Sequence, residues 1–209
     1  MFGLIDPFYE PSSASIDAGQ IWCDQPIYMP PRHGIKIDRI DPHDDRDLGV
    51  KFVGRTKDTF DHMPIKSLGL PSSEALVAAR AKWERPVIVL GGNNAQELTP
   101  AKTDHADIVM AVPVYGADQY DEHTRKRIAG YDFANAFYLP EDKDLKFDEG
   151  FARLDHVQAV HRGHLTRHRG FKLAPDALDA LVEWLFMFMT GRIDPNSVLL
   201  EYRKQAPLS

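Results

Sequence analysis

The residue with the clearest potential for chemistry is an arginine placed at the start of an apolar strand. Arg85 precedes Pro86 and the run Val-Ile-Val-Leu at 87–90, which ends in a Gly-Gly-Asn-Asn turn. A short β-branched run of this kind predicts a strand buried on both faces, and proline is tolerated at a strand's first residue. The pattern therefore holds a permanently charged guanidinium at a strand end, where it could bind a phosphate or a carboxylate. Alternatively, Arg85 is a solvated residue or pairs with Glu84.

A second candidate is the stretch 153–172, which is basic within an acidic chain. It carries four arginines and one lysine against one aspartate, whereas the whole chain has a net charge of −6. Four histidines lie in the same stretch, at 156, 161, 164 and 168, and imidazole can transfer a proton near neutral pH. This band predicts a polyanion site. The alternative is a solvated basic loop that offsets the acidic remainder.

Composition limits the protein class. The 209 residues are 43% hydrophobic and 27% charged, which is typical of a soluble globular protein. With Cys23 alone, neither an intrachain disulfide nor a cysteine-based zinc site is expected. The histidine spacing does not match a helical metal pair, and no nucleotide-binding motif is present, so we expect no metal and no cofactor. We expect no signal peptide, no membrane segment and a cytoplasmic location.

Apolar runs and turn residues predict a mainly β protein with a long C-terminal helix. Pro113 suggests a bulge or a strand end, so that Val114, Tyr115 and Gly116 emerge at a rim. The helix is expected from about Pro175 to Thr190, with one apolar face. Trp184, Met187 and Phe188 lie beyond that face, and this excess predicts a subunit interface or a cover formed by the N-terminal arm or the inserted hairpin. The residues of that face are Leu178, Leu181, Val182, Leu185, Phe186 and Met189.

The remaining segments are expected to decorate one domain, 1–209. We predict an N-terminal arm at 1–18, an insertion at about 25–83 and a C-terminal tail at 192–209. Within the insertion, prolines predict a loop at 25–34, two runs at 35–40 and 50–54 predict a hairpin, and serines at 72 and 73 predict the cap of a helix over 74–82. The segment 155–160 is expected to turn the chain.

Taken in order, these segments resemble the MazF/PemK toxins of bacterial toxin–antitoxin pairs. The matching stretches are Gly-Gln-Ile-Trp-Cys-Asp at 19–24, Arg-Pro-Val-Ile-Val-Leu at 85–90, Ile-Val-Met-Ala-Val-Pro-Val at 108–114, Ala-Arg-Leu-Asp-His-Val-Gln-Ala-Val at 152–160, and the C-terminal helix. The resemblance implies an α+β fold, an SH3-like β-barrel of the MazF/PemK/CcdB type with a C-terminal helix, here carrying an inserted hairpin. It also implies a homodimer, an antitoxin partner, and metal-independent endoribonuclease activity on single-stranded RNA.

The resemblance assigns roles to particular residues. Arg85 matches the arginine that acts on the scissile phosphate, and Asp155 matches a structural acid, with His156 in place of the usual glutamine. The family's catalytic threonine or serine is missing, because Tyr115 and its neighbours Val114 and Gly116 occupy that place.

Two interpretations follow. In the first, the protein is a ribonuclease in which Arg85 neutralises the phosphate, Tyr115 orients it, and His161 or His164 transfers a proton. RNA would then be held by the basic residues Arg32, Arg153, Arg162, Arg167, Arg169 and Lys172, with Trp22 or Tyr28 stacking on bases unless Trp22 packs in the core. In the second, the same barrel is a non-catalytic module that binds a protein partner.

Overall fold

The computed structural model describes residues 5–13, 15–29, 34–41, 43–44, 46–53, 69, 80–91, 108–197 and 199–200. Contacts divide the chain into two compact units, one formed by Met1–Pro26 with Trp83–Ser209 and the other by Ile27–Lys82. The smaller unit spans most of the stretch that we treated as an insertion. Arg32 lies outside the described residues.

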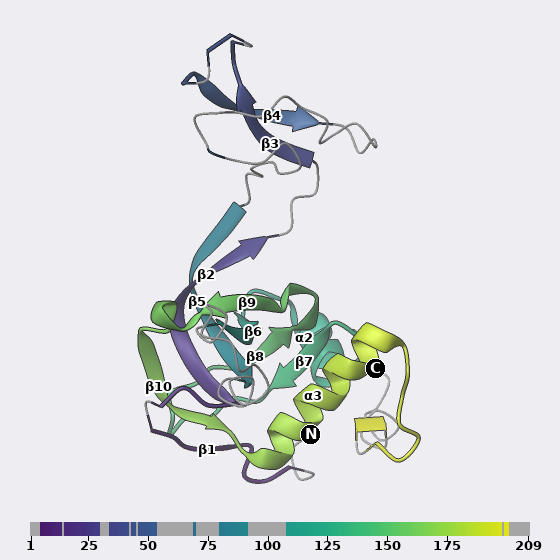
Figure 1. Ribbon diagram of the computed structural model, residues 1–209. Helices are drawn as coiled ribbons and strands as arrows, with labels where there is room; N and C mark the ends of the chain where they lie inside the picture. The colour runs from purple at the N-terminus through teal and green to yellow at the C-terminus, as the bar shows by residue number, and fades with distance from the viewer. Residues whose placement is uncertain are drawn as a thin grey trace, which may run out of the picture. The chain divides into compact units, whose positions relative to one another are not determined.

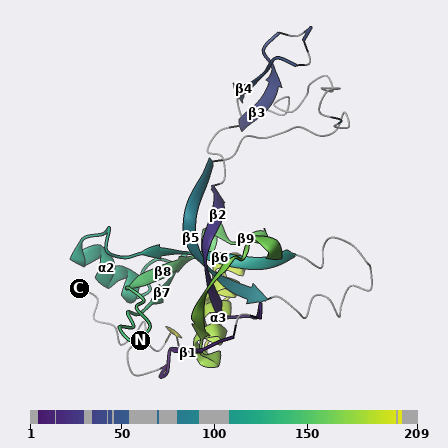
Figure 2. The ribbon, with the colours of Figure 1, turned by 90° about the vertical axis from the view of Figure 1, so that its left-hand side faces the viewer.

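The larger unit is built on a curled eight-stranded sheet (Figures 1 and 2). The strands follow one another in space as β1, β10, β2, β5, β6, β8 and β7, and β9 also pairs with β6. Both ribbon views show β2 running beside β5. The strand bounds are β1 Tyr9–Pro11, β2 Gln20–Met29, β5 Arg80–Gly91, β6 Ile108–Gly116, β7 Ala136–Leu139, β8 Gly150–Arg153, β9 Gln158–His161 and β10 Arg167–Leu173.

Helices complete a mainly β architecture, so the α+β class predicted from sequence is confirmed. In the described residues these are α2, Glu122–Ala129, and α3, Pro175–Thr190, with single 3-10 turns η4, Leu154–His156, and η5, Arg162–His164. Among these described residues no helix combines the length and apolar character needed to cross a membrane. The smaller unit contains the predicted hairpin, β3 Gly34–Arg39 paired with β4 Leu48–Val53.

Strand β6 connects the two halves of the sheet. We predicted a bulge or a strand end at Pro113, but β6 continues to Gly116, and the register shift between β5 and β6 lies between Val89 and Gly91. Pro113 pairs with Val87 of β5 in the middle of the strand. On the other side, β9 pairs with residues 108–111 and β8 with residues 114–116. Pro113 therefore lies where β6 changes partners on one side, between the last residue paired with β9 and the first paired with β8.

Helix α3 begins and ends at the residues that we predicted, but its buried face differs from the predicted apolar face. Pro175 starts the helix, and Gly191, at φ +67°, ends it by donating its N–H to Met187 O. The buried residues are Ala177, Ala180, Leu181 and Trp184. Val182, Phe186 and Met189, three of the six residues that we assigned to one apolar face, are 45%, 57% and 72% exposed.

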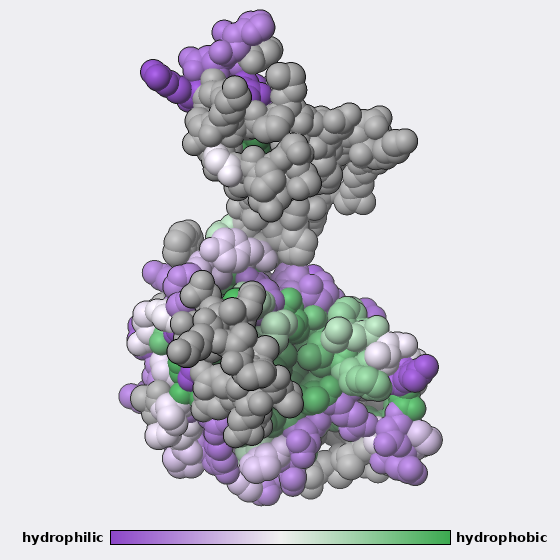
Figure 3. Space-filling view, viewed as in Figure 1, coloured by the Kyte–Doolittle hydropathy of each residue, from purple (hydrophilic) through white to green (hydrophobic). Residues whose placement is uncertain are grey.

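Asp176, Asp179 and Glu183 occupy one side of the helix and the remaining sides are apolar, so the periodicity leaves a broad choice of packed face. The two small alanines let the backbone approach the sheet, and Trp184 then fills the core against Tyr131, with ring centroids 5.0 Å apart. Figure 3 shows the apolar side chains gathered on the face of the molecule where α3 lies.

Three other local predictions were wrong in whole or in part. Residues 25–29 belong to β2 rather than to a loop, and the end of the predicted helix 74–82 is part of β5. Of the predicted turn 155–160, the first residues do turn in η4, but 158–160 lie in β9. In each case pairing within the sheet overrides local preference. The N-terminal arm also joins the sheet, because Tyr9 of β1 pairs with Leu173 of β10 and donates a hydrogen bond to Pro140 O at 2.9 Å.

Candidate functional site

Arg85 and Tyr115 are brought together by the register of β5 and β6. Val87 pairs with Pro113, and continuing this antiparallel register by two residues places Arg85 opposite Tyr115. The guanidinium carbon lies 5.4 Å from the centroid of the Tyr115 ring, a cation–π arrangement. Glu84, directly before Arg85, has a φ of +56°, a conformation that is strained for a residue with a side chain. The local backbone is therefore held in an unusual form immediately before the arginine.

A pocket of about 220 Å³ opens beside this pair. Its charged lining residues are Arg85, Lys146, Arg169 and Asp148. Arg169 is fixed in part by a hydrogen bond from Nη2 to Lys146 O, at 2.8 Å. Three cations against one carboxylate make this pocket suitable for an anion, and phosphate is an anion that arginine binds well.

Glycine is required at one edge of the pocket. Strand β8 begins at Gly150, which pairs with Gly116 of β6. A Cβ at Gly150 would lie 2.8 Å from the backbone oxygen of Tyr115, closer than two such atoms can approach. The absent side chain thus lets β8 pack directly against the part of β6 that carries Tyr115.

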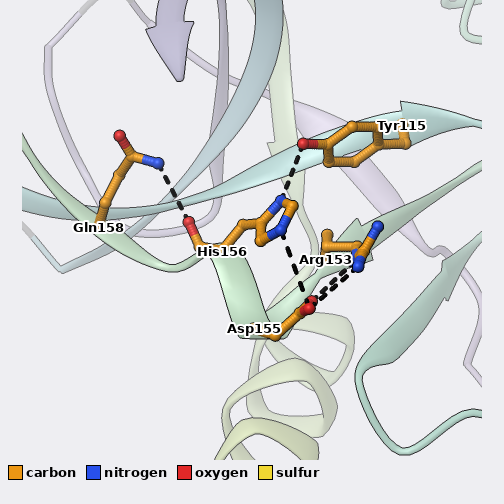
Figure 4. A network of polar contacts seen from close by, with 5 residues as sticks. All are labelled: Tyr115, Arg153, Asp155, His156 and Gln158. Atoms are coloured by element: carbon orange, nitrogen blue, oxygen red, sulfur yellow. Dashed lines mark hydrogen bonds and ion pairs between the residues drawn. The ribbon is translucent and has the colours of Figure 1, made fainter. Parts of the chain in front are cut away.

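The hydroxyl of Tyr115 belongs to a polar network that also contains His156, Asp155 and Arg153 (Figure 4). Tyr115 Oη lies 2.9 Å from His156 Nδ1, and His156 Nε2 lies 3.8 Å from Asp155 Oδ2. Arg153 donates two hydrogen bonds to Asp155, at 2.8 and 3.0 Å. Because η4 directly follows β8, one short segment carries three of the four side chains.

The surroundings shift the proton affinities of this network. Burial raises the pKa of the Tyr115 hydroxyl, and the positive charges of Arg153 and Arg85 only partly oppose it. Burial also acts to raise the pKa of Asp155, but the hydrogen bonds and charge of Arg153 outweigh it and hold that pKa below its usual value. Tyr115 is therefore protonated and Asp155 ionised at neutral pH.

The network can transfer a proton. With the ring proton of His156 on Nε2, facing Asp155, Nδ1 accepts the hydrogen bond of Tyr115. A proton passing from a bound ligand to Tyr115 would move the tyrosine's own proton to Nδ1. Asp155 would then stabilise the resulting imidazolium, as a carboxylate does for other catalytic histidines.

The structure does not bring His161 and His164 to this pocket. His161 pairs with Ile108 at the far end of β6, and Ile108 is seven residues from Tyr115, or about 23 Å along a strand. The two histidine rings lie 5.7 Å from each other, and His161 Nδ1 accepts the N–H of Gly163 at 3.0 Å. His156 is instead the histidine beside Tyr115. In the sequence, the one feature that pointed to His156 was its position next to Asp155. Only the register of β6 with β8 shows that its hydrogen-bond partner is Tyr115.

The predicted RNA-binding residues are distributed over several elements. Arg169 lines the pocket, and Arg153 belongs to the Tyr115 network. Lys172 forms a 3.1 Å ion pair with Glu10, while Arg162 lies in η5 and Arg167 in β10.

Of the two aromatic residues that we considered for base stacking, Trp22 is 5% exposed and donates its indole N–H to Gln20 Oε1 at 3.1 Å, so it belongs to the core. Tyr28 is 55% exposed and lies in the smaller unit.

No protein-family model matches the sequence, and no curated protein matches it. Functional inference therefore depends on the fold and on the geometry of this pocket. Among the residues that the structure describes, no group of three or more histidine, cysteine, aspartate or glutamate side chains could hold a metal ion.

Proposed function

We propose that this chain is a divergent MazF/PemK-like toxin with an SH3-like barrel, and that its pocket at Arg85 and Tyr115 binds and cleaves single-stranded RNA without a metal. The observation that supports this most directly is the position of the Arg85 guanidinium over the Tyr115 ring in a pocket that Lys146 and Arg169 also line. Metal-free cleavage of RNA needs positive charge at the phosphate, a group that takes the 2′-hydroxyl proton and a proton for the leaving 5′-oxygen.

Each requirement has a candidate group. Arg85 stabilises the charge that develops on the phosphate oxygens. The 2′-oxygen attacks phosphorus while its proton passes to Tyr115, and Tyr115 passes its own proton to His156 Nδ1, 2.9 Å away. The bond to the 5′-oxygen breaks, and this oxygen takes a proton from Lys146 or from water. The products are a 2′,3′-cyclic phosphate and a 5′-hydroxyl. In this scheme Tyr115 and His156 together replace the threonine or serine of the family.

The deciding experiment is cleavage of a long single-stranded RNA in the presence of EDTA. We expect wild-type protein to cleave and Arg85→Ala to be inactive while remaining folded. The matched control is His161→Ala combined with His164→Ala, which removes two histidines outside the pocket and should retain activity. Absence of cleavage by folded wild-type protein would refute the ribonuclease function.

A second candidate function is a non-catalytic module that binds a protein, either an antitoxin or another copy of the chain. The exposed apolar side chains of α3 favour it, because Phe186 and Met189 are 57% and 72% exposed on one helix. Sedimentation of the wild type against Phe186→Glu would test this. A homodimer through α3 predicts a monomeric variant, and an unchanged oligomeric state would exclude that interface.

A further inference from the structure

A second, smaller pocket is lined by Phe151, which pairs with Tyr115 of the first pocket across β6 and β8. Its volume is about 170 Å³, below the roughly 300–1,000 Å³ of pockets for drug-sized ligands, so it suits one flat ring system. It is formed by α2, by the segment that enters β7, and by β8. The lining residues that matter here are Tyr120, Ile128, Phe133, Asn135, Phe151 and Arg153.

Aromatic rings dominate the walls of this pocket. The rings of Tyr120 and Phe151 have centroids 5.9 Å apart and are tilted by 60°. The Arg127 guanidinium lies 4.6 Å from the centroid of the Phe133 ring, which also lines the pocket. Aromatic side chains stack on any of the nucleobases, so this contact does not depend on the nucleotide sequence of the ligand.

The polar groups at the edge of the pocket are held in place. Arg153 is fixed by its two hydrogen bonds to Asp155. The side chain of Asn135 also hydrogen-bonds to Asp155, and its backbone carbonyl accepts the N–H of Leu154 at 2.9 Å. An amide carries two N–H donors and a carbonyl acceptor, so Asn135 retains capacity for the edge of a base. Such fixed polar groups reduce the entropy lost on binding.

The two pockets lie along one cross-strand row. The Arg85 guanidinium lies 5.4 Å from the Tyr115 ring, and Tyr115 pairs with Phe151 across β6 and β8, with the two rings stacked at 5.9 Å. Arg85 and Phe151 are therefore separated by two strand spacings, or about 10 Å. A ligand with an anionic group at Arg85 and a flat ring attached to it by a short link would reach both pockets.

We propose that this second pocket is a nucleobase subsite, which binds the unstacked base of the nucleotide whose phosphate lies at Arg85. This inference rests on the proposed function, and it specifies that the substrate is recognised as single-stranded nucleotides with the base turned out of the stack. Asn135 reads the polar edge of the base, and Tyr120 and Phe133 contact its faces.

The test measures the binding of ribonucleosides and of inorganic phosphate separately, by calorimetry or ligand-observed NMR. Tyr120→Ala should weaken nucleoside binding by roughly 5- to 100-fold and leave phosphate binding unchanged. Arg85→Met should weaken phosphate binding and leave nucleoside binding unchanged. Val50→Ala, which shortens an exposed apolar side chain of β4 in the smaller unit, is the control and should change neither. Asn135→Asp should alter the order of preference among the four nucleosides without unfolding the protein.

The outcomes separate this inference from the proposed function. RNA cleavage or phosphate binding at Arg85, together with nucleoside binding that Tyr120→Ala does not alter, would overturn the base subsite and leave the ribonuclease proposal standing. Nucleoside binding that depends on Tyr120, without any RNA cleavage, would support the subsite and refute the ribonuclease. Failure of all four nucleosides to bind the wild type would overturn the subsite.

Discussion

Replacement of Tyr115 by phenylalanine tests the polar network and its proposed chemistry together. The substitution keeps the ring that contacts Arg85 and Phe151 and removes only the hydroxyl, which lies 2.9 Å from His156 Nδ1. Tyr115 and His156 are 4% and 8% exposed. A buried hydrogen bond contributes about 0.5–1.5 kcal/mol net, and a partner left unsatisfied costs about 1–3 kcal/mol.

We therefore expect Tyr115→Phe to lower the free energy of unfolding by about 1–2 kcal/mol. In a chain of this size each kcal/mol lowers Tm by about 2–4 °C, so calorimetry should resolve the change. RNA cleavage should fall to background, while RNA binding to the inactive protein should remain, because Arg85, Lys146 and Arg169 are untouched.

The matched control is Tyr138→Phe. Tyr138 also donates a 2.9 Å hydrogen bond, to Glu149 Oε1, but it lines neither pocket. It should lose comparable stability and retain cleavage. A double-mutant cycle of Tyr115→Phe with His156→Phe should give a coupling energy of about 1 kcal/mol. If the two changes are additive within about 0.5 kcal/mol, or if Tyr115→Phe cleaves like the wild type, the proton-transfer scheme is refuted.

Three further predictions concern the elements that position the site. Trp184→Ala should lower the free energy of unfolding by about 3–5 kcal/mol. Phe186→Ala, on the exposed face of α3, should lower it by less than about 0.5 kcal/mol. Equal shifts of the two urea unfolding midpoints would contradict the described orientation of the helix. Glu84→Gly should raise stability by up to about 1 kcal/mol, because glycine adopts positive φ without strain, and a drop in Tm would show that the side chain stabilises this conformation. The lowered pKa of Asp155 stabilises the fold above the unfolded pKa of about 4, and this contribution is lost as the pH falls through the folded value. Asp155→Asn should therefore be less stable than the wild type in urea unfolding at pH 7, with the difference closing below pH 4, and a gap of constant size would exclude this linkage.

The sequence alone determined features that depend on local chemistry. Pro175 and Gly191 fix the two ends of α3, because the first lacks an N–H that a helix start does not need and the second adopts a left-handed conformation freely. The apolar run after Arg85 specified a strand, although β5 begins at Arg80, so that Arg85 lies within the strand and not at its start as we predicted. Alternating residues specified the hairpin of the smaller unit. These signals act over a few residues, so no tertiary information is needed to interpret them.

Only the tertiary structure decided which side chains meet. The register of β5, β6 and β8 places Tyr115 beside Arg85 and His156, and a shift of one residue would turn Tyr115 to the opposite face of the sheet. The pairing of β9 with β6 places His161 at the far end of β6, although an imidazole there has the same chemistry as that of His156. The packed face of α3 was also undetermined, because apolar side chains cover all of the helix except the side of Asp176, Asp179 and Glu183, and the small alanines decide which part of that surface approaches the sheet. Register and close packing depend on residues far apart in the chain, and for this reason the sequence predicted candidate groups for the site but not their arrangement.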